Sequence, residues 1–449
     1  MWFRQDLRIH DNTALNNAIN QCEEIIPIFV LNHQVTTPRI DNDARLWFLY
    51  AHLEDLACEL NKRGSYLIVK AGVQEDIIME TLKTHDCDAL FYNRSYGPSR
   101  EIRDKTIYEY CQKEYIAVHA YHDYLLVAPS AVPARKVYTP FYKKRLPIVE
   151  EVAKSRTMAT PENISSPLIQ WPTLQEQQAF FPENAHKHWP LCTDLDQLVW
   201  AKDLSDYDET RNIPSVEWTT RLSPYLRFWA ISPRVAFTYF HTNKNPGHEI
   251  IVKELAWREF RQHIAHYFPY AIPQAFQEKR RKVQRENNKE WFEAWKEGKT
   301  GYPLVDAWMR QLKQENRMHN RVRMVVASFL TKDLLIDRRR WAQHFEDYLL
   351  DHDRNVNTWN WQRSASVWAD PKPLRIFNPI LQSQRFDKDC EYILKYVPEL
   401  AGQEKKAIHD PIKYDLDYIT PIVDHYVWSK EAKKRYNEAK AEYQATLEE

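Results

Sequence analysis

The stretch MHNRVRMVVASFLTKD at residues 318–333 decides how the second half of the chain is interpreted. Its apolar side chains recur at helical spacing, at Val322, Val325, Val326, Phe329 and Leu330. This pattern predicts a helix with one buried stripe. Arg321 and Arg323 share its turns, and a buried guanidinium without a counter-charge costs several kcal/mol. The stretch therefore predicts either a salt-bridged helix or a helix whose polar side binds an anionic or hydrogen-bonding ligand.

Composition narrows the class of protein. The 449 residues contain 43% hydrophobic side chains, enough for a large core. The 62 basic and 62 acidic residues cancel, so a nucleic-acid partner would need a local basic patch. The six cysteines have no paired spacing, which indicates a reducing compartment without zinc or disulfides. No signal peptide or membrane-spanning run is visible, and we expect a soluble, cytoplasmic protein.

The first 125 residues alternate between strand-like and helix-like segments. Four short apolar runs read as buried strands, at 24–31, 66–71, 87–93 and 115–119. Residues 43–63 place leucines on one helical face, with Gly64 suited to the C-terminal cap. The chain begins almost inside its first strand, at Met1 to Phe3. Alternation of this kind predicts a doubly wound parallel sheet, here without a Gly-rich dinucleotide or phosphate loop.

The middle of the chain is rich in proline. Nine prolines fall between Pro129 and Pro190, and proline interrupts both helices and strands. We predict a long surface connector there, followed by an almost wholly helical region. The predicted division is an α/β domain at 1–125, a linker at 126–195 and a helical domain at 196–449.

Two further segments carry polar residues that a simple core does not explain. A helix at 249–264 places Glu254, Trp257, Arg258 and Arg261 on one face. That face suits either base stacking with phosphate contacts or an ion-pair ladder covered by one tryptophan. The run KRRKVQR at 279–285 supplies a local basic patch, although charge runs are usually only solvated.

The segment DHDRNVNTWNWQR at 351–363 brings Asp351 and Asp353 two residues apart. These carboxylates can pair with the arginines of the 320 helix, or bind sugar hydroxyls or a ring N–H. The histidines are not arranged with carboxylates or cysteines in a ligand pattern, so we predict no metal site.

Several motifs together resemble one family. They are WFRQDLRIHDN at 2–12, TTRLSPYL at 219–226, ELAWREF at 254–260, TGYPLVDAWMRQL at 300–312, NRVRMVVASFLTKDLLIDRRR at 320–340 and RIFNP at 375–379. They are similar to signature stretches of the DNA photolyase/cryptochrome family, over nearly the whole chain. Asn320 and Arg321 with Met324 look most like class I cyclobutane pyrimidine dimer photolyases.

The resemblance implies a fold and an activity. The fold is an α/β Rossmann-like antenna domain with a parallel sheet, a long linker and an all-α FAD-binding domain. The implied activity is light-driven repair of pyrimidine dimers in DNA by electron transfer from reduced FAD, carried out by a monomer. An antenna chromophore is left open among methenyltetrahydrofolate, 8-hydroxy-5-deazaflavin and none, because Ser99 and Arg100 stand where folate-binding members have an Asn-Glu pair.

The resemblance also assigns residues, position by position. Those matched to FAD are Tyr207, Thr219, Thr220, Arg221, Leu222, Ser223, Arg323, Asp351, Asp353 and Asn357. Those matched to the dimer or the damaged strand are Arg211, Glu254, Trp257, Arg258, Asn320, Arg321, Met324 and Arg363. Within these sets Glu254 would hydrogen-bond the dimer, Trp257 would stack on it, and Asn357 would face the flavin N5 edge. Trp361, Arg338 and Arg285 stand at the inner, middle and outer positions of the photoreduction chain.

Systematic departures from the family accompany this match. Arginine stands where tryptophan is usual, at Arg285, Arg317, Arg338 and Arg363. Tryptophan stands where glycine is usual, at Trp218, Trp229, Trp308, Trp341, Trp359 and Trp368. The exchange accounts for only 7 glycines and as many as 16 tryptophans. Both changes can follow from one first-base codon change, which favours a sequence or translation artefact or a deliberate design over natural drift.

The departures predict functional losses. A guanidinium group cannot carry an electron hole as an indole does. Arg338 and Arg285 should therefore impair photoreduction of FAD. Arg363 removes one stacking wall, worth about 1–3 kcal/mol per base. Tryptophan at a turn with positive φ costs about a kcal/mol or more. The alternatives are therefore a cryptochrome-like light sensor or a repair-deficient DNA-binding flavoprotein of the same fold, and, outside the family, an ordinary nucleotide-binding α/β protein.

Overall fold

The computed structural model describes residues 1–32, 44–154, 158–169, 173–181, 195–199, 204–216, 219–243, 245–369 and 374–448. Contacts divide the chain into two compact units. Unit 1 comprises Met1–Lys202 with Thr220–Pro269, and unit 2 comprises Asp203–Thr219 with Tyr270–Glu449. The three-part division expected from the sequence stays a prediction.

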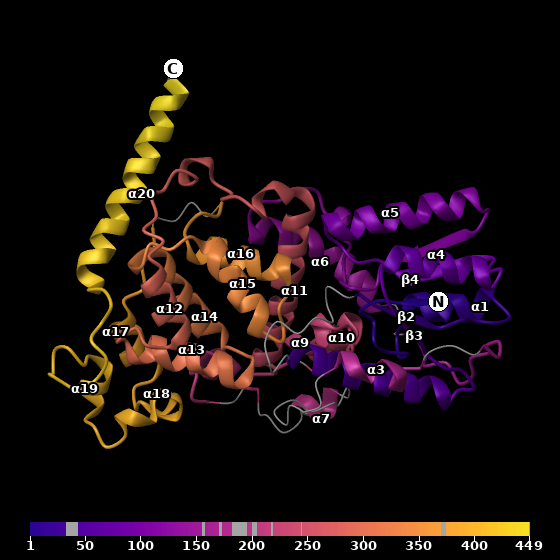
Figure 1. Ribbon diagram of the computed structural model, residues 1–449, viewed down its shortest axis with the longest axis horizontal. Coiled ribbons are helices and arrows are strands. Elements are labelled where there is room, and N and C mark those ends of the chain that lie inside the picture. Colours follow the sequence, from indigo (N-terminus) through magenta and orange to yellow (C-terminus); the bar gives the residue numbers. More distant parts are fainter. Residues whose placement is uncertain are drawn as a thin grey trace. The chain divides into compact units, whose positions relative to one another are not determined.

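Unit 1 is built on a parallel sheet, as predicted (Figure 1). Its strands within the described residues are β1 (Trp2–Phe3), β2 (Ile28–Leu31), β3 (Ile68–Ala71), β4 (Ala89–Asn93) and β5 (Ala117–Tyr121). Their order is β3-β2-β1-β4-β5, so β1 is central and pairs with β2 and β4. A central parallel strand is buried on both faces, which explains why the predicted strands are continuous apolar runs rather than alternating ones.

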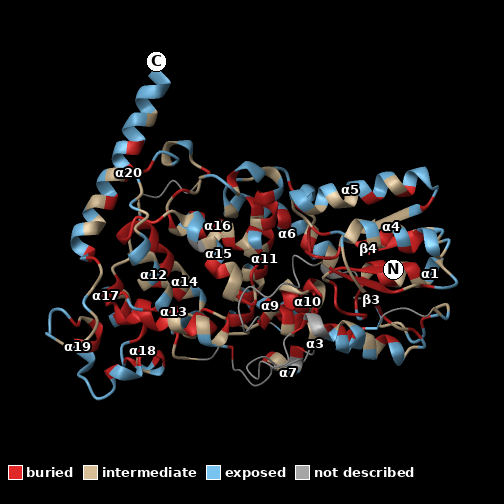
Figure 2. Ribbon diagram, viewed as in Figure 1, coloured by how far each residue is buried: buried red, intermediate tan, exposed pale blue. Residues whose placement is uncertain are grey.

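Helices cover the two faces of the sheet. One core joins Phe3, Phe29 and Phe91 to α1 (Thr13–Gln21) and α3 (Ala44–Asn61). The other joins Trp2, Ile28 and neighbouring strand residues to α4 (Gln74–Thr84) and α5 (Pro98–Lys113). Successive strand residues thus point to opposite cores, as the two-residue period of a strand requires. Figure 2 shows the buried sheet between helices whose outer faces are exposed.

The proline-rich connector is more regular than the sequence suggested. It contains α6 (Tyr138–Lys154), a helix of 17 residues with Pro147 inside it. It also holds the 3-10 turns η1 (Pro129–Ala131) and η2 (Gln175–Phe180) and the short α7 (Leu195–Val199). Pro147 is exposed, and α6 is held elsewhere by a buried pair between Arg145 and Glu259. Tertiary packing therefore offsets the hydrogen bond that the proline removes.

The rest of unit 1 is helical. Its elements are α9 (Ser223–Arg227), α10 (Pro233–Thr242) and α11 (Pro246–Tyr267). Helix α11 extends beyond the predicted 249–264 at both ends, because Asn245 caps it and Pro246 occupies its first turn.

The regular elements of unit 2 within the described residues are all helices, as predicted for this region. Its α-helices are α8 (Tyr207–Thr210), α12 (Lys289–Glu297), α13 (Pro303–Glu315), α14 (Asn320–Ser328), α15 (Arg338–Tyr348), α16 (Arg354–Ser364), α17 (Pro379–Phe386), α18 (Glu391–Tyr396), α19 (Lys405–His409) and α20 (His425–Glu448). Short 3-10 turns lie at Glu278–Arg280 (η4) and Pro398–Leu400 (η6). No helix of the described chain is both long and apolar enough to cross a membrane.

The stretch 318–333 forms α14 and then a π-helical turn, η5 (Phe329–Asp333). The predicted apolar stripe is fully buried. The turn places Lys332 and Asp333 inside the unit, where Lys332 donates to the Arg375 carbonyl and Asp333 pairs with His425. Burial lowers the pKa of Lys332 to about 7 and raises the pKa of Asp333 to about 6.

The motif at 300–312 is a scaffold element. Gly301 has φ +81°, and a Cβ there would lie 2.5 Å from the Pro421 backbone. Asp306 accepts hydrogen bonds from the Thr300 N–H at 2.6 Å and the Gly301 N–H at 3.1 Å. Only glycine fits this turn, and the carboxylate closes it at the start of α13.

The exchanged tryptophans lie in different settings. Trp229 has φ +51°, is buried, and stacks on Tyr124 at 4.6 Å between ring centres. Trp308 and Trp359 are also buried, within α13 and α16, and Trp368 packs 4.6 Å from Trp359. The concern about positive φ is thus confirmed for Trp229 and is wrong for Trp359, which has helical backbone. Trp218 and the side chain of Trp341 lie outside the described residues.

Candidate functional site

The predicted site residues divide between the two units. Unit 1 holds Thr220 to Ser223 and the α11 residues Glu254, Trp257 and Arg258. Unit 2 holds Tyr207, Arg211, Thr219 and all predicted residues from Arg285 onward. We describe the two sets separately.

In unit 1, the face of α11 carries an aromatic cluster that the sequence did not reveal. Trp257 stacks face to face on Tyr138 of α6, with ring centres 3.7 Å apart and planes 5° from parallel. Both rings meet Phe260 edge-on, at 5.8 and 5.7 Å. Glu254 and Trp257 are half-buried. Because Tyr138 is far from Trp257 in sequence, spacing within α11 could not predict this partner.

Arg258 is engaged inside unit 1. Its guanidinium donates to the carbonyls of Tyr124 and Leu226, each at 3.1 Å, and lies 4.2 Å from the Tyr124 ring centre. It therefore ties α11 to two neighbouring segments. Its expected contact with a DNA strand stays a prediction.

The stretch 219–223 leads into α9, which begins at Ser223. Arg221 has φ +53°, a left-handed conformation in which arginine is uncommon. Leu222 is buried, Ser223 is exposed, and Thr220 is half-buried. In unit 2, Tyr207 is buried at the start of α8 and Thr219 is half-buried. Their assignment to FAD stays a prediction.

In unit 2, α14 packs against α16, and a charged pair lies beside this contact. The Arg323 guanidinium lies 2.9 and 3.0 Å from the two carboxylate oxygens of Asp351, and also donates to the Met318 carbonyl at 2.8 Å. The pairing of Asp351 with an arginine of the 320 helix is thereby confirmed. Asp353 instead caps α16, accepting from the Val356 N–H at 3.0 Å.

Asn357 and Trp361 are buried on α16 and bound to each other. The Trp361 indole N–H donates to the Asn357 side-chain oxygen at 2.9 Å. This bond fixes the amide orientation and leaves its NH₂ as the group that Asn357 can offer to a ligand. A neutral donor in the same unit as a guanidinium–carboxylate pair suits the polar edge of a flavin ring, so these residues fit the cofactor that the resemblance implies.

Three arginines of unit 2 lie close to one another, and we call them the Arg321 cluster: Arg211, Arg321 and Arg385. The Arg321 guanidinium donates to Asn212 and lies 4.8 Å from the Phe386 ring centre. Burial and the charges of Arg211 and Arg385 lower the pKa of Arg321. Clustered like charges of this kind favour an anion such as phosphate. Arg385 was not predicted, because it lies about 60 residues from Arg321 on α17.

The neighbouring residues of α14 are more accessible. Asn320 is exposed at the first position of the helix, and Met324 is half-buried. His319, which precedes them, is half-buried near arginines, and desolvation lowers its pKa to about 4.

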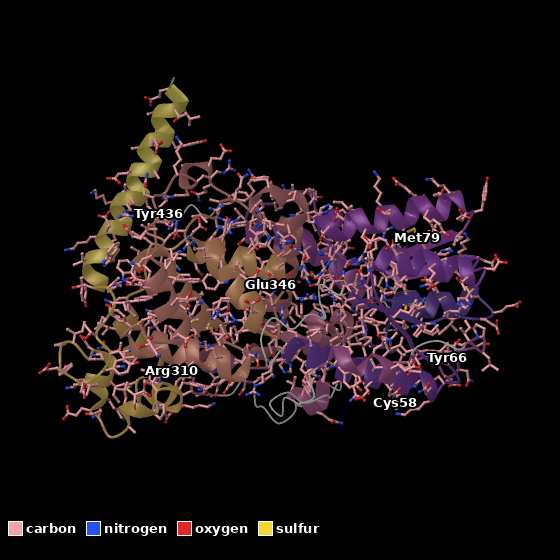
Figure 3. The ribbon with its side chains drawn as sticks, viewed as in Figure 1. Cys58, Tyr66, Met79, Arg310, Glu346 and Tyr436 are labelled. Carbon is pink, nitrogen blue, oxygen red and sulfur yellow. The ribbon has the colours of Figure 1, made fainter. Side chains whose placement is uncertain are left out.

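Three side chains of the basic run 279–285 have partners on α20. Arg280 donates to the Tyr436 carbonyl at 2.6 Å, Arg285 donates to the Tyr436 hydroxyl at 3.2 Å, and Lys282 pairs with Glu442 at 2.8 Å. Tyr436 lies on α20, the helix of the C-terminal segment (Figure 3). The run contacts this helix through Arg280, Lys282 and Arg285, and its role as a local basic patch stays a prediction.

The arginines at the photoreduction positions lie together in unit 2. Arg338 donates to the Gln274 carbonyl at 2.6 Å, and Arg285 donates to the Thr331 carbonyl at 2.9 Å. Burial lowers the pKa of Arg338 to about 10, and the charge of Arg285 adds to that effect. Arg363 is exposed on α16, and Arg317 pairs with Glu315 at 2.8 Å.

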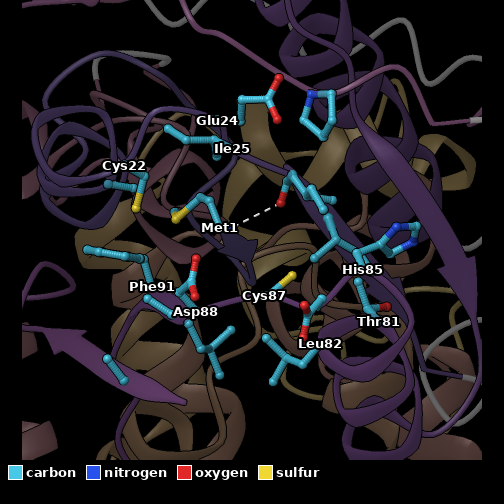
Figure 4. Close-up of a pocket in the computed structure, with 18 of the residues that line it drawn as sticks. Met1, Cys22, Glu24, Ile25, Thr81, Leu82, His85, Cys87, Asp88 and Phe91 are labelled. Carbon is cyan, nitrogen blue, oxygen red and sulfur yellow. Dashed lines mark hydrogen bonds between the residues drawn. The ribbon is translucent and has the colours of Figure 1, made fainter. Parts of the chain in front are cut away.

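Unit 1 also has a pocket of about 690 Å³ at the amino ends of the strands (Figure 4). Its lining includes Met1, Cys22, His85, Cys87 and Phe91. The Met1 amino group donates to the Ile26 carbonyl at 2.9 Å, and burial lowers its pKa to about 6. Within the described part of the chain, the lining of this pocket includes none of the predicted site residues.

Comparison with known proteins agrees with this geometry. Residues 1–162 match the family model for DNA photolyase, and residues 251–438 match the model for the FAD binding domain of DNA photolyase. A deoxyribodipyrimidine photo-lyase of Agrobacterium fabrum is 33% identical, over 95% of this chain and 94% of that protein.

Solved structures extend the likeness to the whole fold. An archaeal photolyase from Sulfolobus tokodaii, crystallised with two FAD molecules, has a TM-score of 0.86 at 31% identity, over 97% of this chain and 99% of that one. A Synechocystis cryptochrome has a TM-score of 0.87 at 26% identity, over 96% and 98%. With both the α/β and the helical segments matched, the chain belongs to the DNA photolyase/cryptochrome family.

Proposed function

We propose that this protein is a cyclobutane pyrimidine dimer photolyase of class I type that uses FAD and acts as a monomer on damaged DNA. The observation that supports it most is the buried Trp361–Asn357 hydrogen bond in the same unit as the Arg323–Asp351 pair. Reduced FAD, when bound, would supply the photoexcited electron that opens the cyclobutane ring.

The protein's own residues have separate tasks in this proposal. Asn357 donates its amide to the flavin edge, while Arg323 and Asp351 balance charge beside the ring. Trp257 stacks on a flipped base, and Glu254 accepts a hydrogen bond from its N–H. The Arg321 cluster, Asn320 and Arg258 contact backbone phosphates of the damaged strand, and Met324 packs against the dimer.

The antenna chromophore stays open. The Sulfolobus tokodaii structure is described as implying a novel light-harvesting cofactor, which adds a second FAD to the two candidates from the sequence. Ser99 and Arg100 lie in the first turn of α5, within unit 1.

A repair assay tests the proposal. The protein is loaded with FAD, the flavin is reduced chemically, and an oligonucleotide with one thymine dimer is illuminated with blue light. Chemical reduction bypasses the altered photoreduction chain. We expect restored thymines with the unchanged chain and strong loss with Asn357→Leu, which removes the amide but keeps a side chain branched at Cγ. Absence of repair by a chain with bound, reduced flavin would overturn the proposal.

A second candidate function is a repair-deficient or light-sensing flavoprotein, and Arg285 and Arg338 favour it. We expect weak photoreduction in the unchanged chain and recovery in the double variant Arg285→Trp, Arg338→Trp. Transient absorption of the oxidised, FAD-bound protein measures this directly. A long-lived neutral tryptophan radical at high yield in the unchanged chain would contradict the expectation.

Arg363 allows a separate test of dimer recognition. Arg363→Trp should tighten binding to dimer DNA by about tenfold, since one stacking platform is worth about 1–3 kcal/mol. Unchanged affinity in a fluorescence anisotropy titration would remove Arg363 from the DNA-binding set.

A further inference from the structure

We propose that Tyr138 is a positioning residue for Trp257, fixing the plane in which the indole meets a pyrimidine. This inference rests on the proposed function, because it concerns how the stacking face is held. Tyr138 lies in α6, outside every segment matched to the site by sequence.

The stack is close and nearly parallel. The ring centres lie 3.7 Å apart with planes 5° from parallel, so the phenol backs one face of the indole. Aromatic pairs generally favour offset or edge-on arrangements. A full face-to-face pair therefore needs other contacts to hold it.

Those contacts are present around Tyr138. Its hydroxyl donates to the Lys253 carbonyl at 3.2 Å, one turn before Trp257 on α11. Its ring meets Phe260 edge-on at 5.8 Å, and Tyr142 lies 5.7 Å away on its own helix. The phenol is thus restrained at its tip and along one edge.

The helix that carries Tyr138 is itself anchored to α11. Arg145 of α6 pairs with Glu259 of α11, and both side chains are almost fully buried. Glu259 also accepts from the Leu126 and Val127 N–H groups. Breaking such a buried network is costly, so α6 provides a fixed base for the tyrosine.

The surroundings of the Tyr138–Trp257 stack keep the Tyr138 hydroxyl protonated as a hydrogen-bond donor. Burial raises the pKa of the Tyr138 hydroxyl above its usual range, Tyr142 and Glu254 raise it further, and Arg145 and Arg261 oppose the shift. The phenol therefore keeps its proton and its bond to Lys253. The Arg261 guanidinium lies 5.5 Å from the Trp257 ring centre and adds positive charge beside the platform.

These contacts indicate that Tyr138 stays against the indole when DNA binds, rather than occupying the place of the base and leaving. A tyrosine that merely fills the place of a base would have to leave on binding, and its removal would strengthen binding. A tyrosine that backs the indole reduces the ordering cost of Trp257, and its removal weakens binding. Removal of Tyr138 therefore changes the DNA affinity in opposite directions for the two roles.

The test is a binding titration on the full chain with labelled DNA, using one dimer oligonucleotide and its undamaged counterpart. Tyr138→Leu should bind the dimer about 2- to 10-fold more weakly, with undamaged DNA unaffected. Tyr138→Phe keeps the ring and should restore most of the affinity. In a Trp257→Ala background, Tyr138→Leu should cause no further loss, which a general folding defect would not reproduce.

The outcomes are separable. If the unchanged chain prefers the dimer and Tyr138→Leu leaves that preference equal or stronger, this inference is overturned alone. If the unchanged chain binds both oligonucleotides equally, the proposed function falls and this inference with it. A loss in Tyr138→Leu that Tyr138→Phe repairs, with equal thermal midpoints for both variants, supports the positioning role.

Discussion

Unit 2 contains two groups of basic residues, one a continuous run in the sequence and the other drawn from separate segments, and the two groups differ in surroundings. The run 279–285 is docked on α20, where a carbonyl, a hydroxyl and a carboxylate engage three of its side chains. In the Arg321 cluster, arginines from separate segments lie close enough to lower the pKa of one member. The first group contacts residues of α20, and we propose that the second contacts an anion.

The comparison teaches that the number of basic residues does not identify a nucleic-acid surface. Partners within the fold decide whether a cation is available. Four substitutions test this, in order of decreasing effect.

Tyr436→Ala should have the largest effect, on stability. Tyr436 is fully buried, and its hydroxyl also donates to the Ala365 carbonyl at 2.7 Å. Removing a buried aromatic ring costs about 3–5 kcal/mol of unfolding free energy. Chemical denaturation measures this, with Tyr443→Ala, farther along α20, as a matched control of small effect. A large rise in affinity for undamaged DNA would mean that the freed run is itself a DNA site.

Arg321→Ala should weaken DNA binding by about tenfold and lower the salt dependence of binding by about one phosphate contact. The physical reason is the loss of the central charge of the cluster. Arg339→Ala is the control, because Arg339 is exposed but pairs with Asp337 at 2.8 Å. Equal losses for the two variants would point to net charge rather than to the cluster.

Arg385→Ala should act in the same direction with a smaller effect, about two- to threefold in affinity, because exposed charges interact weakly. It should also relieve repulsion on Arg321 and return the pKa of that guanidinium toward its usual value. Titrations at two salt concentrations check the first expectation. Loss of affinity without any change in salt dependence would contradict a phosphate contact.

Lys282→Ala should have the smallest effect. Its pair with Glu442 is exposed on both sides, and such pairs contribute about 0–1 kcal/mol. We expect unchanged DNA affinity and a nearly unchanged denaturation midpoint. A clear loss of DNA binding would return the run 279–285 to the candidate surface.

The sheet was predictable because its signal is local. Predicted runs at 66–71 and 87–93 contain β3 and β4, since buried parallel strands are short and continuously apolar. Helix α3 ends at Asn61 rather than at the glycine cap, although Gly64 does take φ +80°. Helix α6 was missed because the prolines dominated the local pattern, while its buried contact with Glu259 is long-range.

Sequence spacing could predict which site residues share one helix face, but not which residues of other segments contact them. Charge made pairing of Asp351 with an arginine of the 320 helix one of several options, and the resemblance singled out Arg323. Tyr138 and Arg385 carry no local pattern that distinguishes them, because their partners lie on other segments. The partners of the run 279–285 could not be predicted for the same reason, since Glu442 and Tyr436 lie more than a hundred residues away.

Trp229 has a consequence for folding yield. Its φ of +51° is a conformation that a bulky residue visits rarely in the unfolded chain. The turn between α9 and α10 should therefore form late, leaving the apolar residues around it exposed to aggregation for longer. We expect a chain with Trp229→Gly to form this turn faster during refolding, while the cavity left by the buried indole lowers the stability of the folded protein. The residue at position 229 therefore affects the folding of the chain, before any ligand is bound.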